Sequence, residues 1–166
     1  IYRRWKNFFM DIVPITEEEI ANWPAHGVVK LENPFADVRG KIQPLVDVMM
    51  RSAVLIESKA GSLRANHYHK TDWHYCYVLS GTIEYIHRPT GSNKEPETII
   101  VDKGEMVFTP PMIDHAMKFP VDTVFLTLSR NPRDQDLRTP ERMAELDLPA
   151  PERRRSSGCS DSLWAA

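Results

Sequence analysis

Short apolar runs that end at turn residues follow one another through the middle of the chain. Each holds four to eight residues rich in aromatic and β-branched side chains, a pattern typical of strands. Gly, Pro and Asn are frequent in the segments between them. The runs lie at residues 52–58, 75–79, 82–87, 98–101, 106–109 and 123–129. A series of short strands with almost no helix predicts an all-β fold, either an antiparallel sandwich or a barrel.

The two ends of the chain differ from this central part. Thr16 is followed by three glutamates, the spacing of a capping box, so a short helix is expected there, ending at Pro24. Residues 131–166 contain three consecutive arginines and a Ser/Gly run, which is typical of a tail. We expect one domain in three parts: an N-terminal lead-in at 1–49 that packs on the barrel, the barrel at 50–130, and a partly flexible C-terminal extension.

Composition and charge exclude several classes of partner. With a net charge of −2 and 42% hydrophobic residues, the chain gives no electrostatic reason to expect nucleic acid or an anionic membrane as partner. No apolar run approaches the roughly 20 residues that span a bilayer. The two cysteines, Cys76 and Cys159, lie in an expected strand and in the tail, which argues against a disulfide framework and favours a reducing cytoplasm.

Histidines are concentrated between two glycines, at 61–81. Three of the six in the chain, His67, His69 and His74, lie within eight residues. Residues two apart on a strand share a face, so His67 and His69 can point at one spot. Cys76 faces the same way as His74 in a regular strand, although a plain buried cysteine is the more common outcome. The segment is therefore the predicted site of the protein.

Other aromatic, methionine and histidine side chains are assigned to packing or to no role. Five are expected to fill the barrel interior, since small barrels are packed inside except near one mouth: Tyr85, Met106, Phe108, Met117 and Phe119. Three alternate out of register with the histidines and are expected to pack between sheets or subunits: Tyr68, Trp73 and Tyr75. His26 and His87 lie in or next to turn segments, and no role is assigned to them.

A second segment complements the histidine-rich one. It contains Gly104, Pro110 after five intervening residues, and His115 five places later. Together, the two segments resemble the paired motifs of the cupin superfamily, over roughly residues 50–129. The resemblance implies a single-domain jelly-roll β-barrel. It also implies a metal site whose ligands, carried over position by position, are His67, His69, His74 and His115.

Two positions depart from the usual cupin pattern. Position 74 is His where cupins usually carry Glu, and position 112 is Met where the second motif usually has Gly. Four imidazoles suit Zn, Fe(II), Ni or Cu and fit Mg or Ca poorly. Such a divalent transition metal can polarise a carbonyl, activate water or bind dioxygen. Asp72 substitutes for the missing carboxylate only if the strand register slips by two residues.

Shorter runs resemble a narrower group of cupins. They are Asp37-Val38-Arg39-Gly40, Arg64 before the histidine pair, His69-Lys70, and the segment 110–115. Similar runs occur in the ketoisomerases of deoxysugar pathways, whose H-x-H pair works without metal and in which Met at position 112 is no departure. In that role His69 or His67 is the base that removes a proton next to a keto group. Arg64 or Lys70 then steadies an anionic enolate or a diphosphate.

These observations lead to a ranked set of functions. We expect a metal-binding cupin enzyme acting on a small molecule in the barrel mouth, by isomerisation or epimerisation of a carbohydrate or nucleotide sugar. A metal-dependent dioxygenase and a non-enzymatic metabolite-binding protein are the alternatives. The expected catalytic residues are His67, His69 and Arg64. The resemblance also implies a homodimer.

Overall fold

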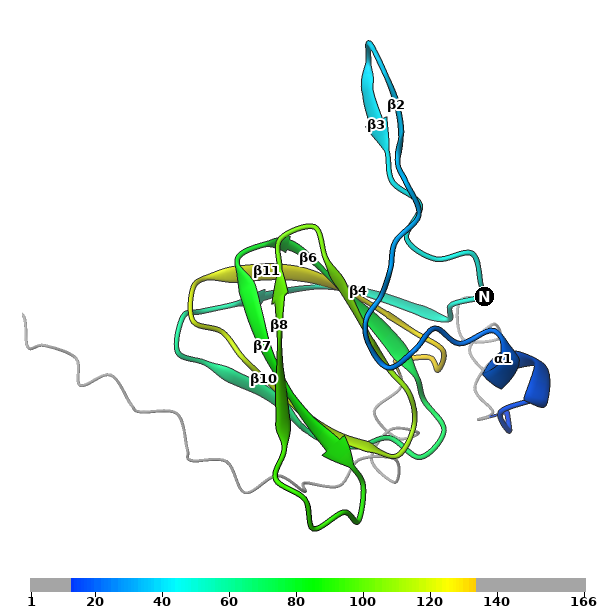
Figure 1. Ribbon diagram of the computed structural model, residues 1–166, viewed down its shortest axis with the longest axis vertical. Helices are drawn as coiled ribbons and strands as arrows, with labels where there is room; N and C mark the ends of the chain where they lie inside the picture. Colours follow the sequence, from blue (N-terminus) through cyan, green and yellow to red (C-terminus); the bar gives the residue numbers. More distant parts are fainter. Residues whose placement is uncertain (1–12, 134–166) are drawn as a thin grey trace, which may run out of the picture.

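The computed structural model describes residues 13–133, and nearly all of their regular structure is β-strand (Figure 1). One short helix, α1 (Glu17–Ala21), comes before the strands. The strands are β1 (Gly27–Val28), β2 (Phe35–Asp37), β3 (Gly40–Ile42), β4 (Ser52–Ser58), β5 (Leu63–His67), β6 (His74–Ser80), β7 (Thr82–Pro89), β8 (Glu97–Asp102), β9 (Met106–Thr109), β10 (Ile113–Lys118) and β11 (Thr123–Ser129). The prediction of an all-β fold with a short N-terminal helix is confirmed. Most of the expected C-terminal extension lies outside the described residues.

Two antiparallel sheets face each other across a shared core. One has the strand order β1-β9-β6-β11-β4, and the other has the order β5-β10-β7-β8. From β4 to β7 the chain changes sheet at every step, which is the winding of a jelly roll. Tyr85, Phe119 and Phe125 are among the buried side chains that meet between the sheets. No helix within residues 13–133 is long and apolar enough to cross a membrane.

A second cluster covers the outer face of the larger sheet. Met106 and Phe108 belong to it, together with Trp73, Tyr75 and apolar residues of the N-terminal lead-in. The prediction that Met106 and Phe108 fill the barrel interior is therefore wrong, and Val107 points inward instead. All four residues of β9 are buried, so the strand shows no alternation of polarity that reveals its inner face. Tyr85, Met117 and Phe119 do lie inside, as predicted.

Arg130, which directly follows β11, ties α1 to the barrel. The expected capping box is present, because the Glu19 N–H donates to Thr16 Oγ1 over 3.1 Å and the Thr16 N–H donates to Glu19 Oε2 over 3.0 Å. The buried Arg130 guanidinium donates to Glu19 Oε1 over 2.6 Å and to the Val13 carbonyl over 2.7 Å. One ion pair thus joins the start of the lead-in to the end of the last strand.

Replacing Glu19 by Gln is expected to destabilise the protein by about 1–3 kcal/mol at neutral pH, because a charge-assisted hydrogen bond to Arg130 is lost. That bond lowers the pKa of the Glu19 carboxyl from 4.5 to about 2. The ionised form therefore adds stability above pH 4.5, and the addition disappears as the pH falls towards about 2. Denaturant unfolding at neutral pH and at about pH 3 should show the difference between wild type and Glu19→Gln shrinking.

The matched control is Glu18→Gln, on the exposed side of the same helix. We expect this variant to unfold at the same denaturant concentration as wild type at both pH values. Equal losses in the two variants, or a Glu19→Gln loss that does not change with pH, would contradict the role given to the ion pair.

The hairpin β2–β3 stands away from the two sheets (Figure 1). Its strands pair with each other and with no other described strand. Every residue in them is exposed, including the large apolar side chains of Phe35 and Ile42, at 61% and 65%. The hairpin thus has no packing partner among the described strands. Because isolated two-stranded hairpins are only marginally stable in water, a partner would be needed to hold it in place.

Candidate active site

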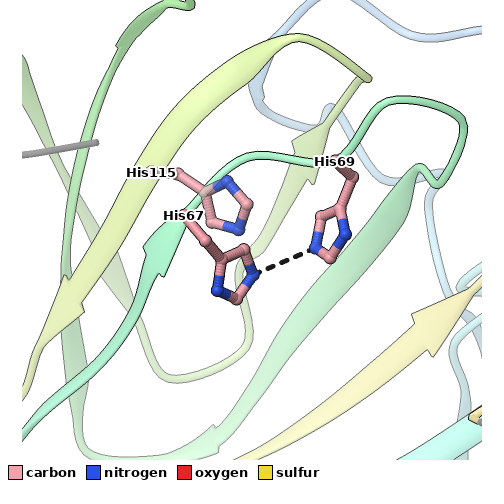
Figure 2. A group of neighbouring side chains, drawn as sticks. All are labelled: His67, His69 and His115. Carbon is pink, nitrogen blue, oxygen red and sulfur yellow. Dashed lines mark hydrogen bonds between the residues drawn. The ribbon is translucent and has the colours of Figure 1, made fainter. Parts of the chain in front are cut away.

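Three histidines converge at one end of the space between the sheets (Figure 2). His67 is the last residue of β5, His69 follows it by two residues, and His115 lies in β10 opposite His67. The Nε2 atoms of His67 and His69 are 3.0 Å apart, and the ring centroids of His67 and His115 are 4.9 Å apart. One nitrogen from each of the three rings lies within 4.8 Å of the others. The two cupin-like segments of the sequence thus meet at this point.

The backbone just before His67 is unusual. Ala65 and Asn66 both have positive φ, at 64° and 60°, which non-glycine residues adopt only at a cost. The pairing of β5 with β10 is also irregular, with a register shift between His115 and Ala116. Such backbone strain costs on the order of 1–3 kcal/mol per residue and clusters at functional sites. Here it accompanies the bulge at which His67 meets His115.

A backbone hydrogen bond orients His115. Its Nδ1 lies 3.0 Å from the Ile113 carbonyl oxygen, which can only accept, so Nδ1 carries the hydrogen. In the neutral ring, the lone pair is therefore on Nε2. A ring fixed in this way can serve as a metal ligand or as a proton acceptor through Nε2.

The larger sheet contributes His74 and the residues just before it. The His74 ring lies 5.5 Å from the His69 ring and 5.2 Å from the His115 ring, between centroids. Asp72 joins this group, since its carboxylate and one nitrogen each of His69 and His74 lie within 4.8 Å of one another. The buried Asp72 carboxylate also accepts a 2.8 Å hydrogen bond from the Asn131 N–H. Asp72 precedes β6 and lies in a loop, so strand register does not decide whether its carboxylate joins the histidines.

A cavity of about 260 Å³ opens beside these rings. His67, His69, His74, His115 and Asp72 line its polar part. Apolar and sulfur-containing side chains line the rest, among them Val54, Ile56, Cys76, Met117 and Phe125. A cavity that combines apolar side chains with a few polar groups can hold a small molecule in a defined orientation.

Two arginines lie at the cavity wall. Arg64 donates from Nε to Ser58 Oγ over 2.7 Å and from Nη2 to the Glu57 carbonyl over 2.9 Å, which orients its guanidinium. Arg133, four residues after β11, is the second, and the sequence held no motif that marked it. Lys70, the other cation suggested by the sequence, is exposed and is not among the residues lining the cavity.

Cys76 lines the cavity as a thiol. Burial raises its pKa to about 12, and its sulfur lies 3.5 Å from Thr127 Oγ1. A thiol with that pKa is neither a ready nucleophile nor a ready metal ligand near neutral pH. The imidazoles and Asp72 therefore carry the chemistry of the site.

The donor set fits a divalent transition metal. Two nitrogens 3.0 Å apart match two ligands of one ion at coordination distances of roughly 2.1 Å. The bond from His115 Nδ1 to a backbone carbonyl is the outer contact that metal-bound histidines commonly make. The same His67–His69 contact equally suits a pair of rings that share a proton. Geometry alone allows both uses.

Comparison with known proteins identifies the fold. No protein-family model and no curated protein matches the chain. Among solved structures, a 3,4-ketoisomerase from Helicobacter canadensis aligns over 74% of this chain and 92% of its own, with 15% identity and a TM-score of 0.61. A sugar 3,4-ketoisomerase from Thermoanaerobacterium thermosaccharolyticum in complex with TDP aligns over 72% and 88%, with 16% identity and a TM-score of 0.58. The fold is a cupin jelly roll.

A third similar structure has a related chemistry. It is a dTDP-4-dehydrorhamnose 3,5-epimerase from Sulfolobus tokodaii, which aligns over 69% of this chain and 80% of its own, with 15% identity and a TM-score of 0.56. The resemblance to deoxysugar cupins noted in the sequence is thus matched in three dimensions.

Proposed function

We propose that this cupin catalyses the isomerisation or epimerisation of a keto sugar linked to a nucleoside diphosphate. The observation that carries the proposal is the 3.0 Å contact between His67 Nε2 and His69 Nε2 at the wall of a cavity that also holds Arg64 and Arg133. The solved structures of similar fold support it, because those named above are two 3,4-ketoisomerases, one of them of a sugar, and a dTDP-4-dehydrorhamnose 3,5-epimerase.

The chemistry begins with removal of a proton from the carbon next to the keto group. Of two neutral rings whose Nε2 atoms are in contact, one donates its hydrogen and the other accepts it. The accepting Nε2 has the lone pair, so once it turns from its neighbour to the substrate, that ring can take up the proton and hold it as an imidazolium. Isomerisation is completed when the former keto carbon receives a proton and the neighbouring hydroxyl loses its own, so that the keto group moves by one carbon. Epimerisation is completed when the original carbon is reprotonated from the opposite face.

The arginines supply the positive charge that this reaction needs. Proton removal leaves a negative enolate, and a diphosphate adds further negative charge. Arg64 is held by Ser58 and Glu57 at one part of the wall, and Arg133 adds a second guanidinium. Guanidinium groups bind phosphate through paired hydrogen bonds, which lysine cannot do.

The direct test is incubation with TDP-4-keto-6-deoxyglucose, the ligand of one ketoisomerase of similar fold, in deuterated water. We expect deuterium to enter the sugar next to the keto group, followed by isomerised or epimerised product, both visible by NMR. TDP alone should raise the melting temperature, since a ligand stabilises the folded state by RT ln(1 + [L]/Kd). The proposal is refuted if no nucleoside diphosphate sugar produces either deuterium exchange or a rise in melting temperature.

We propose as a second candidate that a divalent transition metal binds the same cluster. It is favoured by the two donor groups that share His69, one with His67 and His115 and the other with Asp72 and His74. A bound metal supplies Lewis-acid polarisation of a substrate oxygen, which suits a keto substrate as well as a dioxygenase. The protein residues would hold the ion and orient the substrate beside it.

Elemental analysis of protein purified without a metal-affinity column tests this candidate. About one equivalent of Zn, Fe, Ni or Cu per chain is expected. His115→Gln should lower it, because the oriented Nε2 is lost. Bound Fe(II) with substrate-dependent oxygen uptake would favour the dioxygenase. A metal content below about a tenth of an equivalent, unchanged in His115→Gln, would exclude a metal held by this cluster.

We also propose that the protein is a homodimer in which the β2–β3 hairpin packs on a second copy. Its exposed Phe35 and Ile42 support this, as does the 104% exposure of Val38 at its tip. Sedimentation should give the mass of a dimer for wild type and of a monomer for a Phe35→Ser, Ile42→Ser double variant. A monomeric wild type at micromolar concentration would contradict it.

A further inference from the structure

Two histidines outside the candidate active site form a pair of their own. His26 lies directly before β1, and His87 is in β7. Their ring centroids are 4.5 Å apart at an angle of 50°. The Nε2 atom of each ring is buried and has no hydrogen-bond partner among the described residues. An imidazole nitrogen buried in this way costs about 1–3 kcal/mol, so two together call for an occupant.

The pair lies where the two sheets meet along one side of the jelly roll. β1 is the edge strand of the larger sheet and β8 is the edge strand of the smaller one. Gly27, next to His26, approaches β8 so closely that a Cβ there would come within 3.3 Å of Ile99 Cδ1. β1 has only two residues, so little backbone pairing holds this edge. A bond across it would join the lead-in to β7 and β8.

An acidic side chain lies next to the pair. Glu97 is directly opposite His87 in the β7–β8 ladder, which places the two side chains on the same face. Its negative charge acts on both rings, since it raises the pKa of His26 and of His87 against the larger effect of burial. Burial first and the neighbouring His87 second lower the pKa of His26 to about 4. Both rings are therefore neutral at neutral pH, with lone pairs available to a cation.

The pair is separate from the cavity described above. Neither His26 nor His87 lines that cavity. The Tyr85 ring lies between the two groups and is near a histidine of each. The Tyr85 ring lies 5.2 Å from the His87 ring and 6.1 Å from the His115 ring. Its hydroxyl is hydrogen-bonded to Thr109 Oγ1 over 2.9 Å, so the ring is held in place between His87 and the histidines of the candidate active site.

We propose that His26, His87 and Glu97 form a second cation site, which takes a divalent metal of the Zn²⁺ class and fastens the β1–β8 edge. Two neutral imidazole nitrogens and one carboxylate oxygen are a donor set that Zn²⁺ favours and that Mg²⁺ or Ca²⁺ does not. The three donor atoms do not all lie within 4.8 Å of one another, so the exposed Glu97 side chain turns inward to join the ion. The role is structural, and it does not depend on the reaction proposed for the main cavity.

Zn²⁺ titration of protein stripped with a chelator tests the site. Wild type should bind one equivalent more than His26→Gln or His87→Gln. Each of these variants should weaken that equivalent at least about 100-fold, because even changes to groups that only orient a ligand cost about 10- to 100-fold. Glu97→Gln should weaken it as well, whereas Glu95→Gln, in the loop just before β8, should bind like wild type. The Zn²⁺-dependent rise in melting temperature should disappear with the same equivalent.

The His67→Gln variant distinguishes Zn²⁺ bound by the main histidine cluster from Zn²⁺ bound by the second site. Zn²⁺ bound there is lost in His67→Gln, whereas the second site keeps its equivalent in that variant. Histidine ring signals in ¹⁵N NMR of wild type provide a check that requires no folded variant, with the His26 and His87 signals expected to shift on Zn²⁺ addition. Equal stoichiometry in wild type and His26→Gln, or shifts confined to the rings around His69, would overturn the proposal.

Discussion

Replacing His67 or His69 by Asn is expected to slow deuterium incorporation into TDP-4-keto-6-deoxyglucose by about 10²- to 10⁴-fold, the usual contribution of a general base. Asn keeps a polar side chain of similar reach but cannot take up a proton. The Nε2 atoms of the two histidines are 3.0 Å apart, and we expect the rings to act as one unit. The double variant should therefore be hardly slower than the slower single variant.

The control for this experiment is Lys70→Gln. Lys70 is adjacent to His69 in sequence, but it is exposed and does not line the cavity. Its exchange rate should stay within about twofold of wild type, because no proton transfer passes through it. Full exchange in the His67→Asn, His69→Asn double variant, with the nucleotide still bound, would assign the base to another residue.

Gly81→Ala is expected to destabilise the fold by about 3–4 kcal/mol, the largest stability loss among single glycine replacements. Gly81 joins β6 to β7 with φ +84°, and a Cβ there would come within 2.6 Å of the Asp122 carbonyl oxygen and would overlap Thr123 Oγ1. That hydroxyl cannot move away cheaply, since it accepts from the Thr82 N–H over 3.1 Å. Left-handed strain and overpacking therefore add.

Gly91→Ala separates the two effects. Its φ of +78° is close to that of Gly81, but nothing lies within 4 Å of the added Cβ. It should cost only about 1–2 kcal/mol, the price of a left-handed alanine. Denaturant unfolding of both variants measures the difference between their free energies of unfolding. The melting temperature of Gly81→Ala is expected to lie roughly 10 °C below that of wild type. Equal losses would mean that the close approach to Thr123 contributes nothing.

The strand pattern was readable from the sequence because one face of most strands is buried. In β4, Val54 and Ile56 line the cavity while Leu55 between them is exposed, and such alternation follows from two-residue periodicity. The capping box at Thr16 was readable for a similar local reason, since all of its hydrogen bonds lie within one helical turn. β9 was misassigned because burial on both faces removes the alternation.

Residues brought in by loops were harder to recognise. Asp72 reaches the histidines from the segment before β6, where alternation gives no guidance. Arg133 reaches the cavity after the last strand, and nothing near it in sequence marks a site. His26 and His87 are far apart in the sequence and meet only because β1 and β8 are neighbouring edges.

The sequence by itself determined an all-β sandwich or barrel, because strand periodicity is a local property of the chain. Its resemblance to cupins, carried by motif spacing, implied the jelly roll and the candidate ligands His67, His69, His74 and His115. Tertiary structure alone decided which faces of β9 point inward, that Asp72 and Arg133 join the cavity, and that His26 lies against His87. The physical reason is that these contacts depend on how two sheets stack and how loops cross their ends. Neither leaves a periodic trace in the amino-acid sequence.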